Sequence, residues 1–566
     1  MKGVLSGSSE KEPRHRASTS IGRMKPPCDE AVIHSQTEVL PCCRERSVWV
    51  LAAAIVASSM AFIDSTVVNV ALPALQGSFD ASVVGVQWVV EAYGLTLAAL
   101  ILVGGSMGDL FGRRRVFLLG VVVFAIASIA SGLASTIGQL IAARALQGVG
   151  GAFLVPGSLA LISASFGESE RGQAIGTWSG STAITTAVGP VLGGWLIEHL
   201  SWRWAFFINV PLALLVIVIS LSCVPESKSS RRGRIDWPGA AAVTLSLTGL
   251  VLGFVESSHL GWRHPLVLTS LVAGVIGLMV FQVIEARTAS PMVPLSLFRS
   301  RAFSGANVLT LCLYAAIGIF FFLLPMDLIQ VQGYSAANAG AAVLPLILLM
   351  FLLSRWSGGL VHRYGARLPL VIGPVIVACG FFLFSLPSVG GSYWGTFFLP
   401  VVMLGFGMAV SVAPLTTVVM DAVDQERVGT ASGINNAVAR VGGLLAIAVL
   451  GVVMVHVFSN HLSDHLARIV MPADLRTELQ SNEIRMAALK PPQEVEAQTA
   501  NAIESSILAS FVSGFRLIMW ICAALALVSA AIAWQTISST SSRRTDETLS
   551  PAGEREAARH LSLKAR

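Results

Sequence analysis

The sequence predicts an all-α polytopic membrane protein with fourteen spans, made of two parallel-repeat six-helix bundles and two inserted transmembrane helices. Three observations carry this prediction: a low charge content, a series of long apolar runs, and an internal repeat. Only 12% of the 566 residues are charged, whereas a globular protein has about 25%. The apolar runs favour helices, because barrel strands would be segments of about ten residues with alternating character.

The apolar runs predict fourteen spans with both termini in the cytoplasm. Arg and Lys concentrate in alternate links, such as Arg113–Arg115 after the second run and Lys228 to Arg234 after the sixth, and basic links mark the cytoplasmic side. The distribution of the basic residues behind the net charge of +6 therefore indicates the orientation of the spans and does not indicate a nucleic-acid partner. The predicted spans are 48–73, 84–108, 115–134, 137–162, 173–197, 204–224, 237–256, 265–284, 302–327, 337–357, 368–387, 394–417, 430–457 and 506–536.

An internal repeat predicts the domain organisation. The spacing of Gly105, Asp109, Gly112 and Arg114 recurs at Gly358, His362, Gly365 and Arg367, and "ERGQAIG" recurs as "ERVGTASG" at a nearly equal offset. Two homologous halves in the same orientation are a transporter design, with the substrate site between the halves. The predicted units are a polar tail 1–47, a bundle 48–224, a linker with two extra spans 225–301, a bundle 302–536 that includes an extracytoplasmic loop 458–505, and a polar tail 537–566.

Asp64 is the only charged residue in the first span. It lies sixteen residues after Val48, which is about 24 Å along a helix and near mid-membrane. A charge there costs about 2.5–3.5 kcal/mol, so we interpret Asp64 as a proton carrier; the alternative is a structural carboxylate bonded to a neighbouring helix. Ser58, Ser65 and Asn69 share a helical face that is predicted to line a cavity, with Asp64 at its edge.

Three further charges are candidates for coupling. Glu91 is a second intramembrane acid, for which a functional and a structural role remain equally open. Arg144 lies in the fourth span at a depth compatible with Asp64 or Glu91, and a movable pair of this kind is a plausible proton switch. Asp327 ends the ninth span, where an ordinary solvated charge is expected and an additional acid for substrate is the alternative.

Two glycine-rich segments predict close helix approach. In "GSMGDLFGRRR", Asp109 is expected to bond a helix N-terminus or an arginine across the domain interface and so to latch a cytoplasmic gate; the alternative is a plain turn. In and just before "GSTAITTAVGPVLGG", which begins at Gly180, the pairs Gly176/Gly180 and Gly189/Gly193 predict tight packing, and Pro190 permits a kink. The gate residues are Gly105, Asp109, Gly112, Arg113 and Arg114, and the residues of the second segment are Gly180, Gly189, Pro190, Gly193 and Gly194.

Several classes of chemistry are not predicted. The seven cysteines form no disulfide framework or zinc spacing, and His456, His461 and His465 are not expected to bind a metal. A phosphate-binding loop is absent, so ATP is not expected to drive the protein. The sequence offers no defensible pair of nucleophile and base. We expect no enzyme activity, cofactor, metal or cleavable signal peptide.

The motifs resemble, in order and spacing, those of the major facilitator superfamily, and more specifically its fourteen-span drug:proton antiporter branch of the EmrB/QacA type. The segments that carry the resemblance, over about residues 48–457, are "FIDSTVVNVALPAL", "QWVVEAYGL", "GDLFGRRR", "LIAARALQGVGGA", "GPVLGGW", "WRWAFFINVPL", "SPMVPLSLFRSRAFSGAN", "QVQGYSAANAGAAVLP" and "ERVGTASGINNAVARVGG". The resemblance implies proton or cation coupling at Asp64, proton transfer at Arg144, cytoplasmic gating by the 105–114 segment, and an antiporter motif in the fifth span. His362 and Asp327 depart from the branch pattern.

The resulting expectation is a proton-coupled exporter of amphipathic, cationic or neutral compounds that works by alternating access in the cytoplasmic (inner) membrane. The alternatives are an exporter of one metabolite such as a siderophore, lipid or amino acid, a non-transporting sensor or scaffold, and a uniporter or channel. The expected partners are the lipid bilayer, small amphipathic substrates and protons. Whether a periplasmic adaptor engages the 458–505 loop, and the oligomeric state, are left open.

Overall fold

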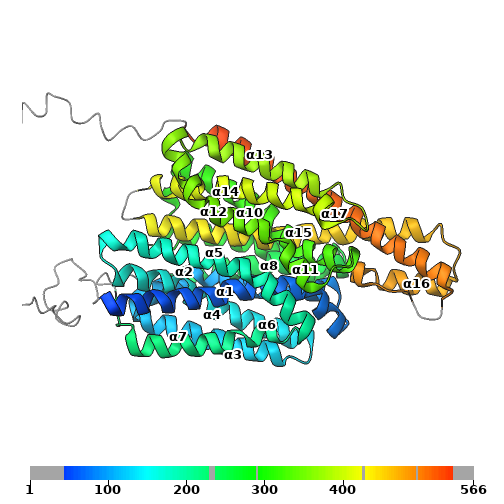
Figure 1. Ribbon diagram of the computed structural model, residues 1–566, viewed down its shortest axis with the longest axis horizontal. Coiled ribbons are helices and arrows are strands. Elements are labelled where there is room, and N and C mark those ends of the chain that lie inside the picture. The colour runs from blue at the N-terminus through cyan, green and yellow to red at the C-terminus, as the bar shows by residue number, and fades with distance from the viewer. Residues whose placement is uncertain (1–43, 229–235, 289–290, 424–426, 492–494, 539–566) are drawn as a thin grey trace, which may run out of the picture.

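The computed structural model describes residues 44–228, 236–288, 291–423, 427–491 and 495–538, and within these residues every regular element is a helix (Figure 1). The described residues contain fourteen helical segments that are long and apolar enough to cross a membrane. The predicted fold class and number of spans are therefore confirmed. Most of the two predicted polar tails, the basic residues at 231–234 and Glu426 of the second repeat lie outside the described residues.

The described part of the first half, residues 44–228, contains seven helices. Two of them begin at a hydroxyl cap: Ser82 accepts a hydrogen bond from the amide of Gly85, and Thr136 accepts one from that of Gln139. The helices are α1 (Arg44–Phe79), α2 (Val83–Phe111), α3 (Arg113–Leu133), α4 (Ile137–Ser165), α5 (Glu168–His199), α6 (Trp204–Phe207) and α7 (Asn209–Cys223).

The inserted helices and the second half follow. The inserted pair is α8 (Trp237–Leu260) and α9 (Pro265–Arg287). The second half contains η2 (Leu295–Arg299), α10 (Arg301–Met326), η3 (Asp327–Val331), α11 (Ala336–Ala342), α12 (Leu344–Tyr364), α13 (Arg367–Phe384), η4 (Tyr393–Phe397), α14 (Phe398–Asp421), α15 (Val428–Leu466), α16 (Ala473–Ser481), η6 (Glu483–Ala488) and α17 (Ala497–Thr536).

The predicted tenth span corresponds to one candidate span, Ala336–Leu353, which is divided between α11 and α12. Pro345 in the first turn of α12 has no N–H with which to continue the preceding helix. Other predicted boundaries are wrong. The predicted loop 458–505 is mostly helical, because α15 continues to Leu466 and α17 already begins at Ala497. The two helices therefore extend beyond the rest of the bundle, with α16 beside them (Figure 1), while η6 lies back against α1 and α2.

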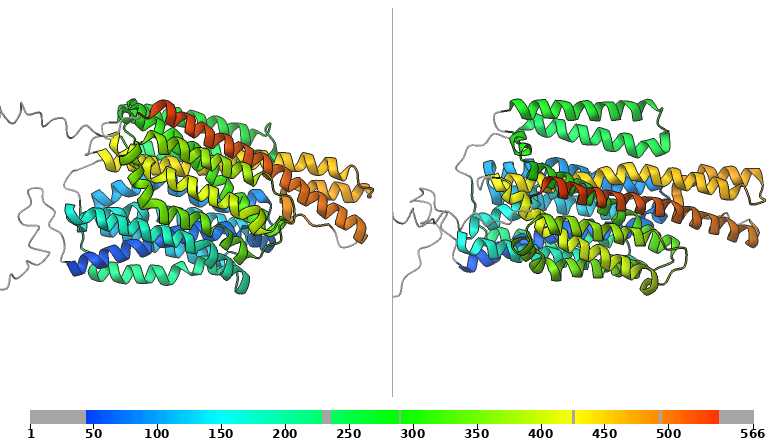
Figure 2. Two further views of the ribbon diagram at one scale, coloured as in Figure 1. Left: turned by 45° about the horizontal axis from the view of Figure 1, so that its top comes forward. Right: turned by 90° about the horizontal axis from the view of Figure 1, so that it is seen from above.

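The helices form two bodies with a hairpin beside them. Helices α1–α7 pack mainly on one another, as do α10 and α12–α17, whereas α11 packs mainly on α5 of the first body. The bodies meet where α1, α2 and α5 contact α10, α11, α12 and α15. The inserted α8 and α9 form a separate green hairpin at the edge of the molecule, and α8 packs on both α2 and α15 (Figure 2). The inserted pair thus covers one of the seams between the bodies.

Candidate functional site

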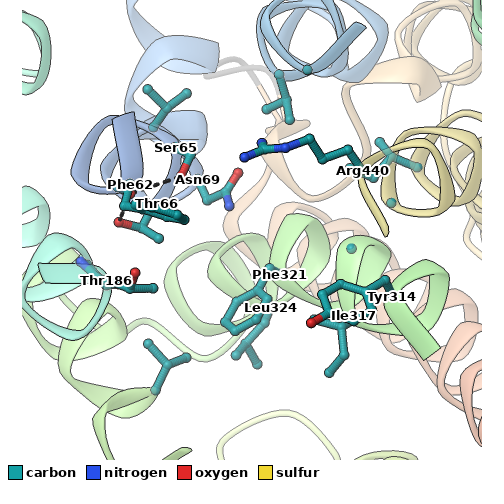
Figure 3. Close-up of a pocket in the computed structure, with 18 of the residues that line it drawn as sticks. Phe62, Ser65, Thr66, Asn69, Thr186, Tyr314, Ile317, Phe321, Leu324 and Arg440 are labelled. Carbon is teal, nitrogen blue, oxygen red and sulfur yellow. Dashed lines mark hydrogen bonds between the residues drawn. The ribbon is translucent and has the colours of Figure 1, made fainter. Parts of the chain in front are cut away.

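A cavity of about 580 Å³ lies between the two bodies. Residues of α1, α2, α4 and α5 line it from the first body, and residues of α10, α11, α12, α14 and α15 line it from the second. Its lining is largely apolar, with Phe62, Phe321 and Leu324 among the large side chains, and Asn69 and Arg440 among the polar ones (Figure 3). The predicted site between the halves is therefore a real cavity of the size of a small ligand site.

Asp64 lies beside the cavity in a buried polar network of the first body. Its carboxylate accepts hydrogen bonds from Arg144 Nη1 at 2.5 Å, Gln147 Nε2 at 2.7 Å and Asn209 Nδ2 at 3.1 Å. The side chain is 0% exposed and that of Arg144 is 1% exposed. The buried carboxylate is therefore balanced by one cation and two neutral donors, which reach it from α4 and α7.

Arg144 connects this network to the cavity, because it contacts Asp64 and also lines the cavity. Its guanidinium donates to the backbone oxygen of Val89 at 3.2 Å and to Gln147 Oε1 at 2.7 Å, and its Cζ stands 4.2 Å from the centre of the Tyr93 ring. Of the two acids predicted as partners of Arg144, Asp64 is the one in contact. A change in the charge of Asp64 would thus alter the electrostatic interactions of Arg144 at the cavity wall.

The polar face predicted on α1 is only partly directed at the cavity. Ser65 and Asn69 line it. Ser58 instead accepts a hydrogen bond from Trp178 Nε1 of α5 at 2.9 Å, inside the first body. Helical periodicity groups residues on one face, but a long helix meets different neighbours along its length.

Glu91 and Asp327 are buried away from the cavity lining. Glu91 is 0% exposed, and neither of its carboxylate oxygens has a hydrogen-bond partner among the described residues. Asp327 is only 2% exposed, in a π-helical turn that follows α10. The expectation of a solvated Asp327 is therefore wrong, because α17 and η6 pack against this turn.

The 105–114 segment bonds within its own body in this structure. Asp109 Oδ1 pairs with Arg113 Nη2 at 2.9 Å, one turn further along the chain. The amide of Arg114 donates to Glu226 Oε1 at 3.1 Å, and its Nη1 donates to the backbone oxygen of Val224 at 3.0 Å. The expected bond from Asp109 across the domain interface is not formed with any of the described residues. A methyl group on Gly105 would make only ordinary contact with Pro156, whereas Gly112 has a φ of +112° and Glu226 packed against it.

The glycines of α5 differ in their surroundings, and the helix runs unbroken through Pro190. A methyl group on Gly189 would overlap Thr66, and one on Gly193 would lie 2.7 Å from Val67, so this pair packs tightly on α1 as predicted. The pair Gly176 and Gly180 does not pack tightly, since a methyl group would meet nothing at Gly176 and would make ordinary contact at Gly180. Tight packing needs an adjacent backbone as well as the spacing.

Gly194 takes part in a backbone contact between the two bodies. A methyl group on Gly194 would overlap the backbone oxygen of Ala336 on α11, and one on Gly340 of α11 would overlap the backbone oxygen of Pro190. The contact lies at the end of the bundle that carries α16 and η6, which we call the outer end in accordance with the predicted topology. Two glycines therefore allow α5 and α11 to close together at the outer end.

Side-chain hydrogen bonds join the same end of the two bodies. Gln76 Oε1 accepts from Gln330 Nε2 at 3.0 Å, and Gln76 Nε2 donates to the backbone oxygen of Arg485 at 3.0 Å. Arg485 forms a two-pronged pair with Asp80, with N–O distances of 2.5 and 2.8 Å. The η6 segment is thus attached to the turn between α1 and α2.

Asp80→Asn is expected to loosen this attachment only slightly. The pair is largely exposed, and exposed pairs contribute about 0.2–1 kcal/mol; Asn also tolerates the φ of +49° at this position. Hydrogen exchange of residues 467–491 should therefore rise modestly, while Asp464→Asn on the exposed end of α15 should leave it unchanged. No change in the Asp80 variant would show that Gln76 and the burial of Met486 hold η6 without the ion pair.

Sequence reasoning missed three members of the Asp64 network and left Arg440 without a role. Gln147, Asn209 and Ser128 are uncharged residues inside spans, and Asn209 and Gln147 also bond Ser128, at 3.2 and 2.8 Å. Their polarity within apolar runs was the available signal. The position of a residue along its span predicts its depth in the membrane. The direction in which its side chain points can be known only from the packed structure.

The family model of the Major Facilitator Superfamily matches residues 54–447. The chain belongs to the major facilitator superfamily. Among similar proteins is "Multidrug resistance protein Stp" of Mycobacterium tuberculosis (strain CDC 1551 / Oshkosh), which is 33% identical over 485 residues covering 84% of this chain and 89% of that protein. The "Tetracenomycin C resistance and export protein" of Streptomyces glaucescens is 34% identical over 487 residues, which cover 85% and 90% of the two chains.

A solved structure has the same fold at low sequence identity. The bacterial homologue of the human lysosomal transporter Spinster, in an inward-facing and occupied conformation, superposes with a TM-score of 0.60 at 16% identity and covers 87% of this chain and 97% of that one. This major facilitator protein is a multi-pass membrane transporter and not an enzyme, with relatives named for drug resistance and export. The predicted family and the absence of an enzyme activity are confirmed.

Proposed function

We propose that the chain exports amphipathic compounds across the cytoplasmic membrane in exchange for protons, with both termini in the cytoplasm. The observation that carries the proposal is the buried pair of Asp64 and Arg144, of which Arg144 also lines the cavity between the two bodies. Acids buried within transmembrane segments are costly and are typical of proton pathways. The names of the relatives support drug-like cargo.

The geometry suggests how a proton would act. A proton on Asp64 removes the ionic part of its contact with Arg144, which then retains Gln147, Val89 and the Tyr93 ring as partners. The polar bonds among α1, α4 and α7 are weakened by the same event. Transport by alternating access requires the outer contact of α5 with α11 to open and the inner end to close. Glu91 is a second candidate proton carrier, because its buried carboxylate lacks a partner among the described residues.

Uptake into proteoliposomes with an acidic lumen tests this proposal. A suitable panel is dansylglycine, dansylglycinamide and dansylcadaverine, which share a fluorophore and carry a negative, no and a positive charge. We expect at least one compound to accumulate above the level in protein-free liposomes, and a protonophore to abolish that accumulation. Flux that is equal with and without the gradient would overturn the proposal in favour of a uniporter or channel.

Export of one specific metabolite is the second candidate. It is favoured by the name of the Streptomyces glaucescens relative, which refers to a single compound. A transporter of this kind would respond to one member of a chemical series and reject close analogues of equal size and charge. A broad exporter would accept many compounds, because an apolar wall places few geometric demands on its ligand.

A further inference from the structure

We propose that Arg440 binds an acidic group of the transported compound, so that the cavity selects anionic amphipathic substrates. The inference rests on the proposed transport function, whose sequence-based form expected cationic or neutral cargo. The inference concerns the charge of the transported compound, and its evidence is the set of charged side chains around the cavity.

Arg440 lies on α15 and faces the cavity. Figure 3 shows its side chain extending from α15 towards Asn69 and Ser65 of α1. Within the described part of the chain, Arg440 has no hydrogen bond and no ion pair; the other cavity arginine, Arg144, is paired with Asp64. One of the two cationic side chains at the cavity is therefore neutralised and the other is not.

None of the described residues that line the cavity is acidic. Of the acids predicted inside the first two spans, Asp64 is bonded to Arg144, and Glu91 does not line the cavity. An unpaired guanidinium within a transmembrane span is costly, and an anion that binds there offsets the cost. A cationic ligand would meet repulsion from Arg440 and would find no carboxylate in return.

The rest of the wall suits an amphipathic anion. Asn69 and Asn436 supply further polar groups, while Phe321 and Leu324 of α10 present an apolar surface. A compound with its acidic group at Arg440 could lay its apolar part against that surface. Guanidinium groups favour carboxylate, sulfonate and phosphate, because their planar donors match two oxygens at once.

Equilibrium binding to the purified full-length protein tests the inference without any proton gradient. With the three dansyl compounds, we expect dansylglycine to bind about tenfold or more tightly than dansylglycinamide, because a hydrogen bond to a charged group contributes about 1.5–3 kcal/mol. Dansylcadaverine should bind most weakly. Arg440→Gln should abolish the preference, and Arg440→Lys should restore part of it. Arg468→Gln, an equal charge change on an exposed residue beyond α15, should retain it.

Two results would overturn the inference: equal or tighter binding of the neutral or cationic compound to the wild type, or an anion preference that persists in Arg440→Gln. Because Arg440 has no partner within the described chain, its replacement is not expected to unfold the protein, and size-exclusion chromatography checks this. A protein that binds anions selectively but shows no gradient-dependent uptake would refute proton coupling and leave this inference standing. Gradient-dependent uptake without anion preference would refute this inference and leave proton coupling standing.

Discussion

Asp64→Asn is expected to abolish gradient-driven uptake and also to destabilise the protein. The substitution removes the proton-binding carboxylate and leaves Arg144 buried without its counter-charge. Removing one member of a buried ion pair costs about 3–5 kcal/mol. The variant alone therefore cannot separate a coupling role from a structural one.

The double variant Asp64→Asn/Arg144→Gln separates the two roles. It removes both charges together and leaves amides that can still bond with Gln147, so that thermal stability in detergent should return towards the wild-type value. Gradient-driven uptake should remain absent. Recovery of driven uptake along with stability would mean that Asp64 is a structural carboxylate, and the search for the proton site would then move to Glu91.

Gly340→Ala is expected to hold the outer end open and to abolish transport in a folded protein. Its new methyl group would overlap the backbone oxygen of Pro190, and neither backbone can move aside as a flexible side chain can. Alternating access requires this contact to form once in every cycle. The conformation in which α5 and α11 are in contact should therefore become inaccessible.

Labelling of a cavity cysteine measures this effect. In a background without the native cysteines, Asn69→Cys should react faster with a membrane-impermeant maleimide from the outside when Gly340→Ala is present. Gly77→Ala is the control, since a methyl group on that outer-end glycine of α1 meets nothing within 4 Å. Unchanged labelling and normal transport in Gly340→Ala would show that the α5–α11 contact is not part of the cycle.

The sequence predicted the fold well because one property, long apolar runs, decides where helices can cross a bilayer. It predicted the ends of the helices less well. The continuation of α15 to Leu466 and the early start of α17 at Ala497 lie in polar sequence, where hydropathy gives no signal and the two helices and η6 stabilise one another by packing.

The candidate site was predictable in its charges and less so in its contacts. Asp64 and Arg144 stand out because charges are rare in spans, and their equal depth suggested a pair. The neutral partners Gln147 and Asn209 and the solitary position of Arg440 depend on the direction of each side chain. The spacing of Gly176 and Gly180 likewise predicted tight helix packing, but a methyl group on Gly176 would meet no described residue within 4 Å.

The central claim is that substrate export is coupled to a proton carried by Asp64, and proton movement driven by substrate alone tests it most directly. Proteoliposomes that enclose the pH dye pyranine and the dansyl compound transported by the wild type are diluted into probe-free buffer at equal pH, with valinomycin and potassium holding the membrane potential at zero. The account predicts that the lumen acidifies as the compound leaves through the wild type, and not with Asp64→Asn/Arg144→Gln. Exit of the compound through the wild type without acidification would contradict it.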